Sequence, residues 1–228
     1  MSDLSIGKYY ILYVDLLGYK SAMDEKSEIG FLKIIDESYK MASELLASMS
    51  IATNLVFEYK VFSDNIVVAV KADSTHALYP LCFVSLALQR NFIDKEILCR
   101  GAITKGTLHI NQEYVFGSGI IRAYELEKTV AYYPRIILDR LLETDAEFKD
   151  YDVCCQDNDG YTIIDYLRMR DSNDVLMIKS LLLAKHKRFI EAGLNDYGEV
   201  ERIFQKYAWC REYHNSSCDR FDFPNMII

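Results

Sequence analysis

A tight hairpin inside the chain is the feature that most restricts its fold. Residues 55–61 and 65–71 are rich in β-branched and aromatic side chains, which favour strands, and only residues 62–64 lie between them. Two strands joined by so short a connection run antiparallel. The sheet that contains them is therefore not all parallel, which argues against a doubly wound dinucleotide-binding fold.

The pattern around the hairpin predicts an α/β (α+β) fold with one central sheet. Residues 9–15 form an aromatic and β-branched stretch that predicts a buried strand, and residues 20–50 predict one or two helices covering the sheet. Further helices are predicted at 75–91 and 120–128, and further strands at 99–103, 107–110, 114–116 and 135–138. This order of elements favours a ferredoxin-like palm.

The division of the chain is predicted from a change in its pattern. Residues 1–140 are expected to form the main domain, and residues 141–228 a helical extension packed on the same core. Helices are predicted at 175–194 and 200–213, with a turn at 156–160. With only three prolines, the sequence contains no Pro-rich linker between the two parts.

Composition limits the partners and the compartment. Lys and Arg number 26 against 34 Asp and Glu, a net charge of −8, which argues against binding nucleic acid or an anionic membrane. The longest apolar stretch, residues 78–88, is shorter than the ~20 residues that span a bilayer. None of the six Cys forms a CxxC pair, so reduced structural thiols are expected. We therefore expect a cytoplasmic protein with no membrane segment.

Two aspartates stand where carboxylates need compensation. Asp15 ends the apolar strand at 9–15, and Asp64 lies at the hairpin predicted to pair beside it. Carboxylates at an apolar strand end are costly, and two neighbouring ones repel each other. A divalent metal would resolve both problems. The alternative is that each Asp only caps a turn, but the pairing in this topology favours metal.

Four segments resemble, in the same order, the motifs of class III nucleotidyl cyclases. They are YVDLLGY at 13–19, KVFSD at 60–64, RGAITKG at 100–106 and FGSGIIRAYELE at 116–127. The resemblance covers residues 9–139. It implies a palm of the class III type, with residues 1–140 as the catalytic domain, working as a head-to-tail homodimer with shared active sites.

The resemblance implies the metal ligands and a catalytic cation. Asp15, Asp64 and the Leu16 carbonyl would bind two divalent metal ions, Mg²⁺ or Mn²⁺. Such ions activate the ribose 3′-hydroxyl and neutralise the triphosphate. Arg100 would contact the phosphates as a fixed cation.

The resemblance also implies substrate-binding groups. Backbone N–H groups at Leu17, Gly18 and Tyr19 would cradle phosphate. Lys60 keeps one purine-reading position of adenylyl cyclases, whereas Tyr114 replaces the Asp at the other. The base pocket is therefore altered, and Tyr114 would fill space meant for a larger ring.

Two further positions depart from the family pattern. Ile121 and Glu125 stand where the family has its transition-state Asn and Arg, and neither can stabilise a developing phosphorane charge. The sequence does not choose among the three cations that could replace the missing Arg, which are Lys105, Arg122 and Arg135.

These departures, with the segments at 116–127, 133–137 and 206–215, resemble the pyrimidine cyclases of Pycsar antiphage defence. That resemblance implies conversion of UTP to 3′,5′-cyclic UMP and pyrophosphate, as an antiviral messenger sensed by a separate effector protein. The choice of UTP over CTP rests on family frequency, so a cytidylate cyclase making cyclic CMP is the nearest alternative.

Two alternative functions from other classes of protein remain open. A catalytically degenerate, cyclase-like nucleotide-binding module is favoured by Ile121 and Glu125 and opposed by the retained Asp15–Asp64 pair. A palm-type polymerase or dinucleotide cyclase is disfavoured by the acidic surface and by the lack of a Gly–Gly–acidic–acidic–Phe turn.

Overall fold

The computed structural model describes residues 5–18, 25–73, 75–143, 151–168 and 175–228. Its centre is an eight-stranded sheet in the order β2-β3-β1-β4-β6-β8-β7, with β5 paired to β4. The strands are β1 (Gly7–Leu16), β2 (Phe57–Phe62), β3 (Asn65–Lys71), β4 (Cys99–Ile110), β5 (Val115–Phe116), β6 (Ile136–Leu138), β7 (Cys154–Gln156) and β8 (Thr162–Ile164). The helices are α1 (Glu25–Thr53), α2 (Leu78–Asp94), α3 (Ser118–Thr129), α4 (Val175–Asp196) and α5 (Glu201–Phe221).

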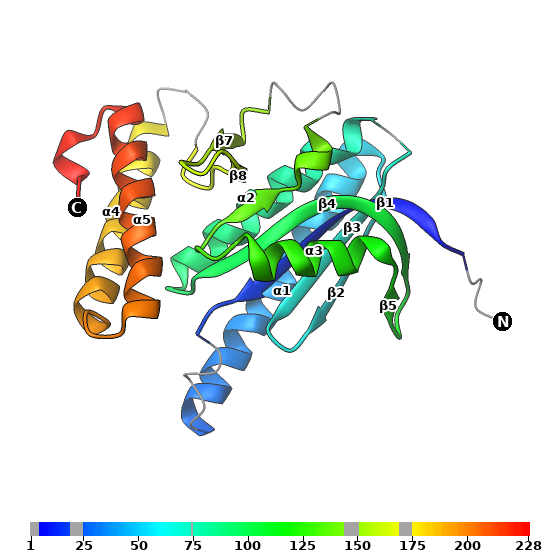
Figure 1. The fold of residues 1–228 in the computed structure, drawn as a ribbon, viewed down its shortest axis with the longest axis horizontal. Helices are drawn as coiled ribbons and strands as arrows, with labels where there is room; N and C mark the ends of the chain where they lie inside the picture. Colours follow the sequence, from blue (N-terminus) through cyan, green and yellow to red (C-terminus); the bar gives the residue numbers. More distant parts are fainter. Residues whose placement is uncertain (1–4, 19–24, 74, 144–150, 169–174) are drawn as a thin grey trace.

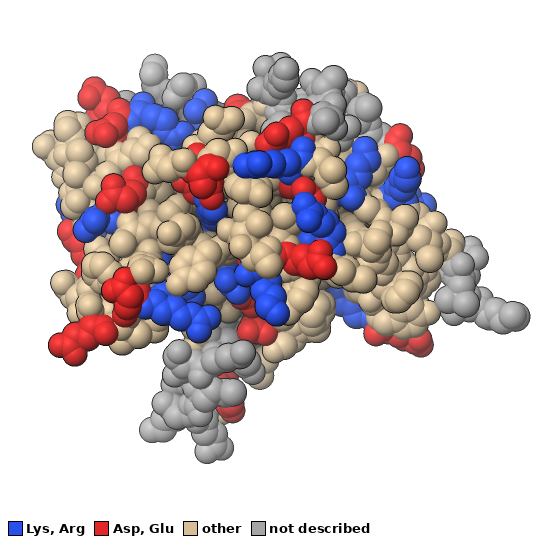
Figure 2. Space-filling view, viewed as in Figure 1, with Lys and Arg blue, Asp and Glu red and all other residues tan. Residues whose placement is uncertain are grey.

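The sheet confirms the predicted palm. Strand β1 lies between β3 and β4 and pairs with both antiparallel, while β4 and β6 are parallel. Helices α1 and α2 cover one face, α3 covers the other, and α4 and α5 stand side by side at one end (Figure 1). On the face that carries α3, Lys and Arg are interspersed with Asp and Glu rather than gathered into one broad basic field (Figure 2).

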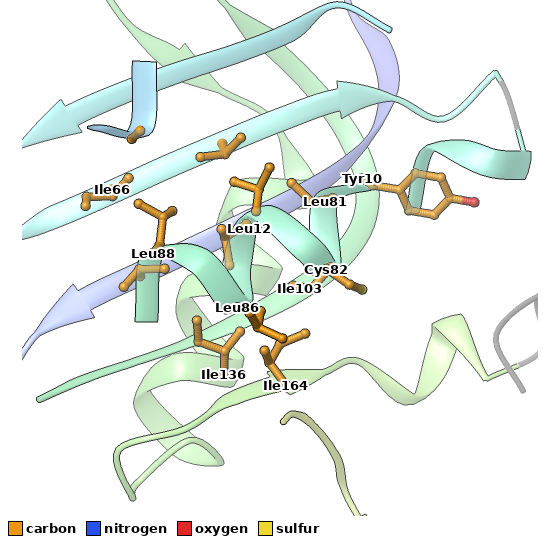
Figure 3. Close-up of a cluster of buried hydrophobic side chains, with 14 of the residues drawn as sticks. Tyr10, Leu12, Ile66, Leu81, Cys82, Leu86, Leu88, Ile103, Ile136 and Ile164 are labelled. Atoms are coloured by element: carbon orange, nitrogen blue, oxygen red, sulfur yellow. The ribbon is translucent and has the colours of Figure 1, made fainter. Parts of the chain in front are cut away.

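Strand β1 shows the two-residue alternation of a sheet with a core on each face. Its even-numbered residues from Tyr10 to Leu16 pack with α1 and α2 (Figure 3), and its odd-numbered residues from Tyr9 to Tyr13 pack under α3. Both faces are apolar, as predicted for a buried central strand. The polar Asp15 interrupts this pattern near the strand end.

Two glycines bring α3 against the sheet. A Cβ on Gly106 of β4 would lie 2.5 Å from the Gly119 Cα, and one on Gly119 would lie 2.2 Å from the Ile11 Cδ1. Neither position has room for a side chain, so helix and sheet backbones approach directly. This close packing sets the height at which the later turns of α3 stand over the end of β1.

The predicted hairpin is present. Strands β2 and β3 are joined by a two-residue turn at Ser63 and Asp64. Ser63 has a φ of 54°, in the left-handed region that glycine adopts at least cost. The turn places Asp64 beside the end of β1.

Two expectations about strands were wrong. Strand β4 is one continuous 12-residue strand rather than separate pieces, because residues 104–108 continue the ladder with β1. Residues 141–228 are not a purely helical extension, because β7 and β8 form a hairpin that widens the main sheet next to β6. Helices α4 and α5 pack on a separate apolar cluster that includes residues of β4, β6 and β8.

Candidate functional site

A cavity of about 810 Å³ opens at the end of the sheet where β1 stops. Its walls come from the end of β1, the β2–β3 turn, the α2–β4 turn, the start of β4, one face of α3 and the first turns of α5. The volume falls within the range typical of small-ligand sites. Figure 2 shows Lys and Arg side chains gathered in this region, between the lower end of α5 and the end of β1.

The predicted aspartate pair lies in this cavity. Asp15 stands opposite Asn65 in the β1–β3 register, and the Leu16 N–H donates to the Asp64 carbonyl at 2.9 Å. Both carboxylates line the cavity, and the Asn65 side-chain amide donates to Asp64 Oδ1 at 3.2 Å. The antiparallel pairing of β1 with β3 therefore places the turn residue Asp64 beside Asp15 at the end of β1.

Arg100 lies next to the pair but is already engaged. Its Nε contacts Asp15 Oδ2 at 3.3 Å, and its Nη2 lies 2.5 Å from Glu127 Oε1 on α3. The second contact is ionic rather than an aligned hydrogen bond, since Glu127 Oε1 has no hydrogen-bond partner. The guanidinium therefore lies at the cavity wall and is ion-paired with two carboxylates.

Burial dominates the electrostatics of these acids. It raises the pKa of Asp15, an effect that Arg100 opposes and Asp64 reinforces. Burial also raises the pKa of Glu127 to about 7, with the charges of Asp15 and Asp64 adding to the shift against Arg100. Asp15 and Glu127 are therefore incompletely compensated, which is common where a cation or substrate is to bind. The sequence motif contained Glu127, but no role was assigned to it.

The donor set fits a divalent metal in part. Asp15, Asp64 and the Leu16 carbonyl offer hard oxygen ligands of the kind Mg²⁺ and Mn²⁺ prefer. The described part of the chain contains no group of three or more His, Cys, Asp or Glu able to hold a metal ion. Such an ion would therefore need further oxygens from water or from substrate phosphates, as Mg²⁺ usually does.

The segment expected to cradle phosphate is only partly available. The Leu17 N–H donates to the Leu98 carbonyl at 2.8 Å, so the expectation that it would face a phosphate does not hold in this conformation. Gly18 lines the cavity with a φ of 98°. Tyr19 lies outside the described residues.

The two predicted base-reading residues lie together, but away from the cavity. The Lys60 ammonium donates to the carbonyls of Asn111 and Gln112, in the loop between β4 and β5. Tyr114 is in the same loop and packs its ring on His109 at 5.3 Å. Neither Lys60 nor Tyr114 lines the cavity that contains Asp15 and Asp64. Within one chain the residues predicted to read the base are therefore separate from those predicted to bind metal.

The candidates for the missing arginine are engaged elsewhere. Arg122 binds Asp139 through Nε and Nη2 at 2.9 and 3.1 Å. Arg135 is buried and paired with Asp157 and Asp159. Lys105 lies over the Tyr10 ring, 4.9 Å from its centroid. None of the three lines the cavity. Ile121 and Glu125 are both exposed on α3.

Helix α5 supplies cations that the sequence interpretation missed. Arg202 and Lys206 both line the cavity, together with Lys128 of α3. Positions 202 and 206 are four residues apart, so one helix face carries both. That spacing was visible in the sequence, but only the fold shows that this face closes the cavity.

Comparisons with known proteins support the fold. No family model matches the sequence, and no curated protein matches it. The adenylyl cyclase CyaB from P. aeruginosa is similar with a TM-score of 0.50 and 12% identity, over 75% of this chain and 97% of that one. The catalytic core of a rhodopsin-guanylyl cyclase with converted specificity, in complex with ATPalphaS, is similar with a TM-score of 0.50 and 11% identity, over 70% and 97%. The chain therefore has the class III cyclase fold.

Across the described ranges, no helix combines the length and the apolar character needed to cross a bilayer.

Proposed function

We propose that this chain is a nucleotidyl cyclase that converts a nucleoside triphosphate into a 3′,5′-cyclic nucleotide and pyrophosphate. The observation that carries the proposal is the meeting of Asp15 and Asp64 in a nucleotide-sized cavity of a class III cyclase palm. The buried acids with raised pKa values and the surrounding cations suit a metal–triphosphate complex. A degenerate fold would have no need to keep two carboxylates there.

The residues of the chain would divide the work. Asp15, Asp64 and the Leu16 carbonyl would hold two Mg²⁺ or Mn²⁺ ions, which when bound lower the pKa of the ribose 3′-hydroxyl and neutralise phosphate charge. Arg100, fixed by its contact with Glu127, would orient the phosphates. The 3′-oxygen would then attack the α-phosphorus, and the bond to pyrophosphate would break.

For the base, we propose a pyrimidine, with UTP as the substrate and cyclic UMP as the product. The altered purine-reading position at Tyr114 supports this, as do the departures at Ile121 and Glu125. Cyclic CMP from CTP is the alternative product. We further propose that the cyclic nucleotide product acts as an antiviral messenger, which a separate effector protein senses.

We propose that the active form is a homodimer with shared sites. The separation of the Lys60–Tyr114 loop from the cavity supports this, since a head-to-tail partner could bring one chain's loop to the other chain's cavity. Large apolar side chains also stand exposed on β5 and α3, with Phe116 63% and Ile121 56% exposed. Such surface favours burial against a second copy.

The test is turnover of each of the four nucleoside triphosphates with Mn²⁺, with products identified by mass spectrometry. We expect a cyclic pyrimidine nucleotide. A cyclic purine product alone would refute the pyrimidine assignment, and no turnover of any substrate would favour the degenerate module.

Asp64→Ala tests the metal role in the same assay. We expect turnover to fall by about 10³-fold or more, because one carboxylate alone cannot hold both metals. Asp73→Ala is the matched control, since Asp73 is exposed and outside the cavity. A fully active Asp64→Ala enzyme would contradict the metal assignment.

A further inference from the structure

Lys128 of α3 lines the cavity, and so do three further cations from two other parts of the chain. Arg100 comes from β4, whereas Arg202 and Lys206 come from α5, beyond the expected catalytic domain. Arg100 has carboxylate partners in Asp15 and Glu127. Arg202 and Lys206 form no hydrogen bond or ion pair with any residue that the structure describes.

Lys206 is in an unfavourable position without a ligand. Burial lowers the pKa of its ammonium, and the positive charges of Arg100 and Arg202 lower it further. The charges of Asp15 and Glu127 act in the opposite direction without overcoming these effects. A half-buried cation beside two others is costly unless an anion binds among them.

The carboxylates of the cavity do not supply that anion. Of the four that line it, Glu96 is exposed and forms no ion pair among the described residues. Asp15 and Glu127 already contact Arg100, and Asp15 with Asp64 is proposed to hold metal. An additional negative group from outside the chain would satisfy Lys206. A polyphosphate suits the site, because Arg and Lys are the usual phosphate-binding side chains and several phosphate oxygens can contact several cations at once.

We propose that Lys206 and Arg202 bind the β- and γ-phosphates of the nucleoside triphosphate, so that α5 forms part of the substrate site. This rests on the proposed function for the identity of the substrate, but the polyphosphate site itself stands on the three cations. Residues 141–228 would then take part in substrate binding in cis, in addition to packing on the core. Neither cation occupies a position of the four cyclase-like motifs.

The experiment measures binding separately from turnover. Inorganic tripolyphosphate is titrated into the full-length protein by calorimetry in Mg²⁺ buffer, for the wild type and for Lys206→Gln and Arg202→Gln. We expect each substitution to weaken affinity about tenfold, the effect of losing one charge-assisted phosphate contact. Arg211→Gln on the same helix is the control, because Arg211 pairs with Glu212 and does not line the cavity.

A second readout separates ligand binding from a structural role. Without ligand, Lys206→Gln should melt at a higher temperature than the wild type, because it removes an uncompensated half-buried charge. Lys206→Arg should keep most of the tripolyphosphate affinity. A structural lysine would instead lose stability on substitution and show no change in affinity.

The outcomes distinguish the two proposals. Equal tripolyphosphate affinity in wild type and Lys206→Gln, or no binding to the wild type, would overturn this inference and leave the Asp64 test standing. Lys206-dependent tripolyphosphate binding without turnover of any nucleoside triphosphate would support the anion site and reject the cyclase.

Discussion

Hydrogen-bond partners compensate a buried carboxylate elsewhere in the sheet, whereas the buried carboxylates of the cavity are only partly compensated. Asp139, only 1% exposed, accepts from Arg122 at 2.9 and 3.1 Å and from the Thr104 hydroxyl at 2.7 Å. Burial alone would raise its pKa, but these hydrogen bonds hold it below the ordinary value. In the cavity, the pKa values of Asp15 and Glu127 are raised instead.

The same contrast holds for the cations. Arg135 is 2% exposed and pairs with Asp157 and Asp159, whereas Lys206 in the cavity has no ion-pair partner among the described residues. Buried charges with ion-pair partners hold a fold in one arrangement, and buried charges without them mark a place kept for a ligand. This distinction assigns Arg122 and Arg135 to the structure rather than to catalysis.

The largest effect expected from this contrast is on stability. Asp139→Asn should lower the free energy of unfolding by about 3 kcal/mol, because it removes the buried carboxylate that accepts hydrogen bonds from Arg122 and Thr104. Urea denaturation at pH 7 measures the change. Asp15→Asn is the matched variant and should change stability by less than about 1 kcal/mol, since it removes a carboxylate that burial already disfavours. Equal losses would mean that Asp15 is a structural residue.

An intermediate effect should appear in the pH dependence of the free energy of unfolding. The pKa of Glu127 rises from 4.5 to about 7 on folding, so the folded state binds more protons than the unfolded state between these values. Its contribution to stability is therefore present at low pH and is lost as pH rises through about 7. Glu127→Gln has no carboxyl group at this position and does not lose stability in this way. The free energy of unfolding of the variant, relative to that of the wild type, should therefore increase between pH 4.5 and about 7, by at most about 3 kcal/mol.

Denaturation of both proteins at pH 5 and pH 8 measures that difference. Glu125→Gln is the control, because Glu125 lies on the exposed face of the same helix. If the Glu127 and Glu125 variants follow the same pH dependence, the raised pKa at Glu127 is refuted.

The smallest effect concerns the turn that positions Asp64. Ser63 holds a φ of 54°, which costs an L-residue about 1 kcal/mol or more. Ser63→Gly should therefore raise stability by up to about 1 kcal/mol, less the extra entropy of Gly in the unfolded chain. Thermal unfolding measures this, and a lower melting temperature would show that the Ser63 side chain has a stabilising contact.

Much of the fold could be predicted because its signals are local. Three of these signals depend on neighbours within a few positions: the continuous apolar stretch of residues 9–14, the hairpin at 62–64 and the helical stretches. The β7–β8 hairpin was missed because its strands have three residues each. The signal was the β-branched stretch at 161–164 after a Gly turn, which was given less weight than the helices around it.

The candidate site also has features that the sequence could predict and features that it could not. The proximity of Asp15 and Asp64 could be predicted once the hairpin was expected to pair beside the strand at 9–15, because both acids then lie at the same end of the sheet. The engagement of Lys60 by the β4–β5 loop was not predictable, nor was the Leu17 contact with Leu98, since both join segments distant in sequence. Their partners are set by packing rather than by local pattern.

The sequence by itself determined the antiparallel palm and the acidic pair at the end of its central strand. Periodicity and turn chemistry act over a few residues and suffice for both. Only the tertiary structure decided which charges are compensated. It paired Arg122 with the buried Asp139 and the buried Arg135 with Asp157 and Asp159, and it brought Lys206 to the cavity without an ion-pair partner among the described residues. Electrostatic compensation depends on distances between segments far apart in the chain, and those distances exist only once the helices have packed.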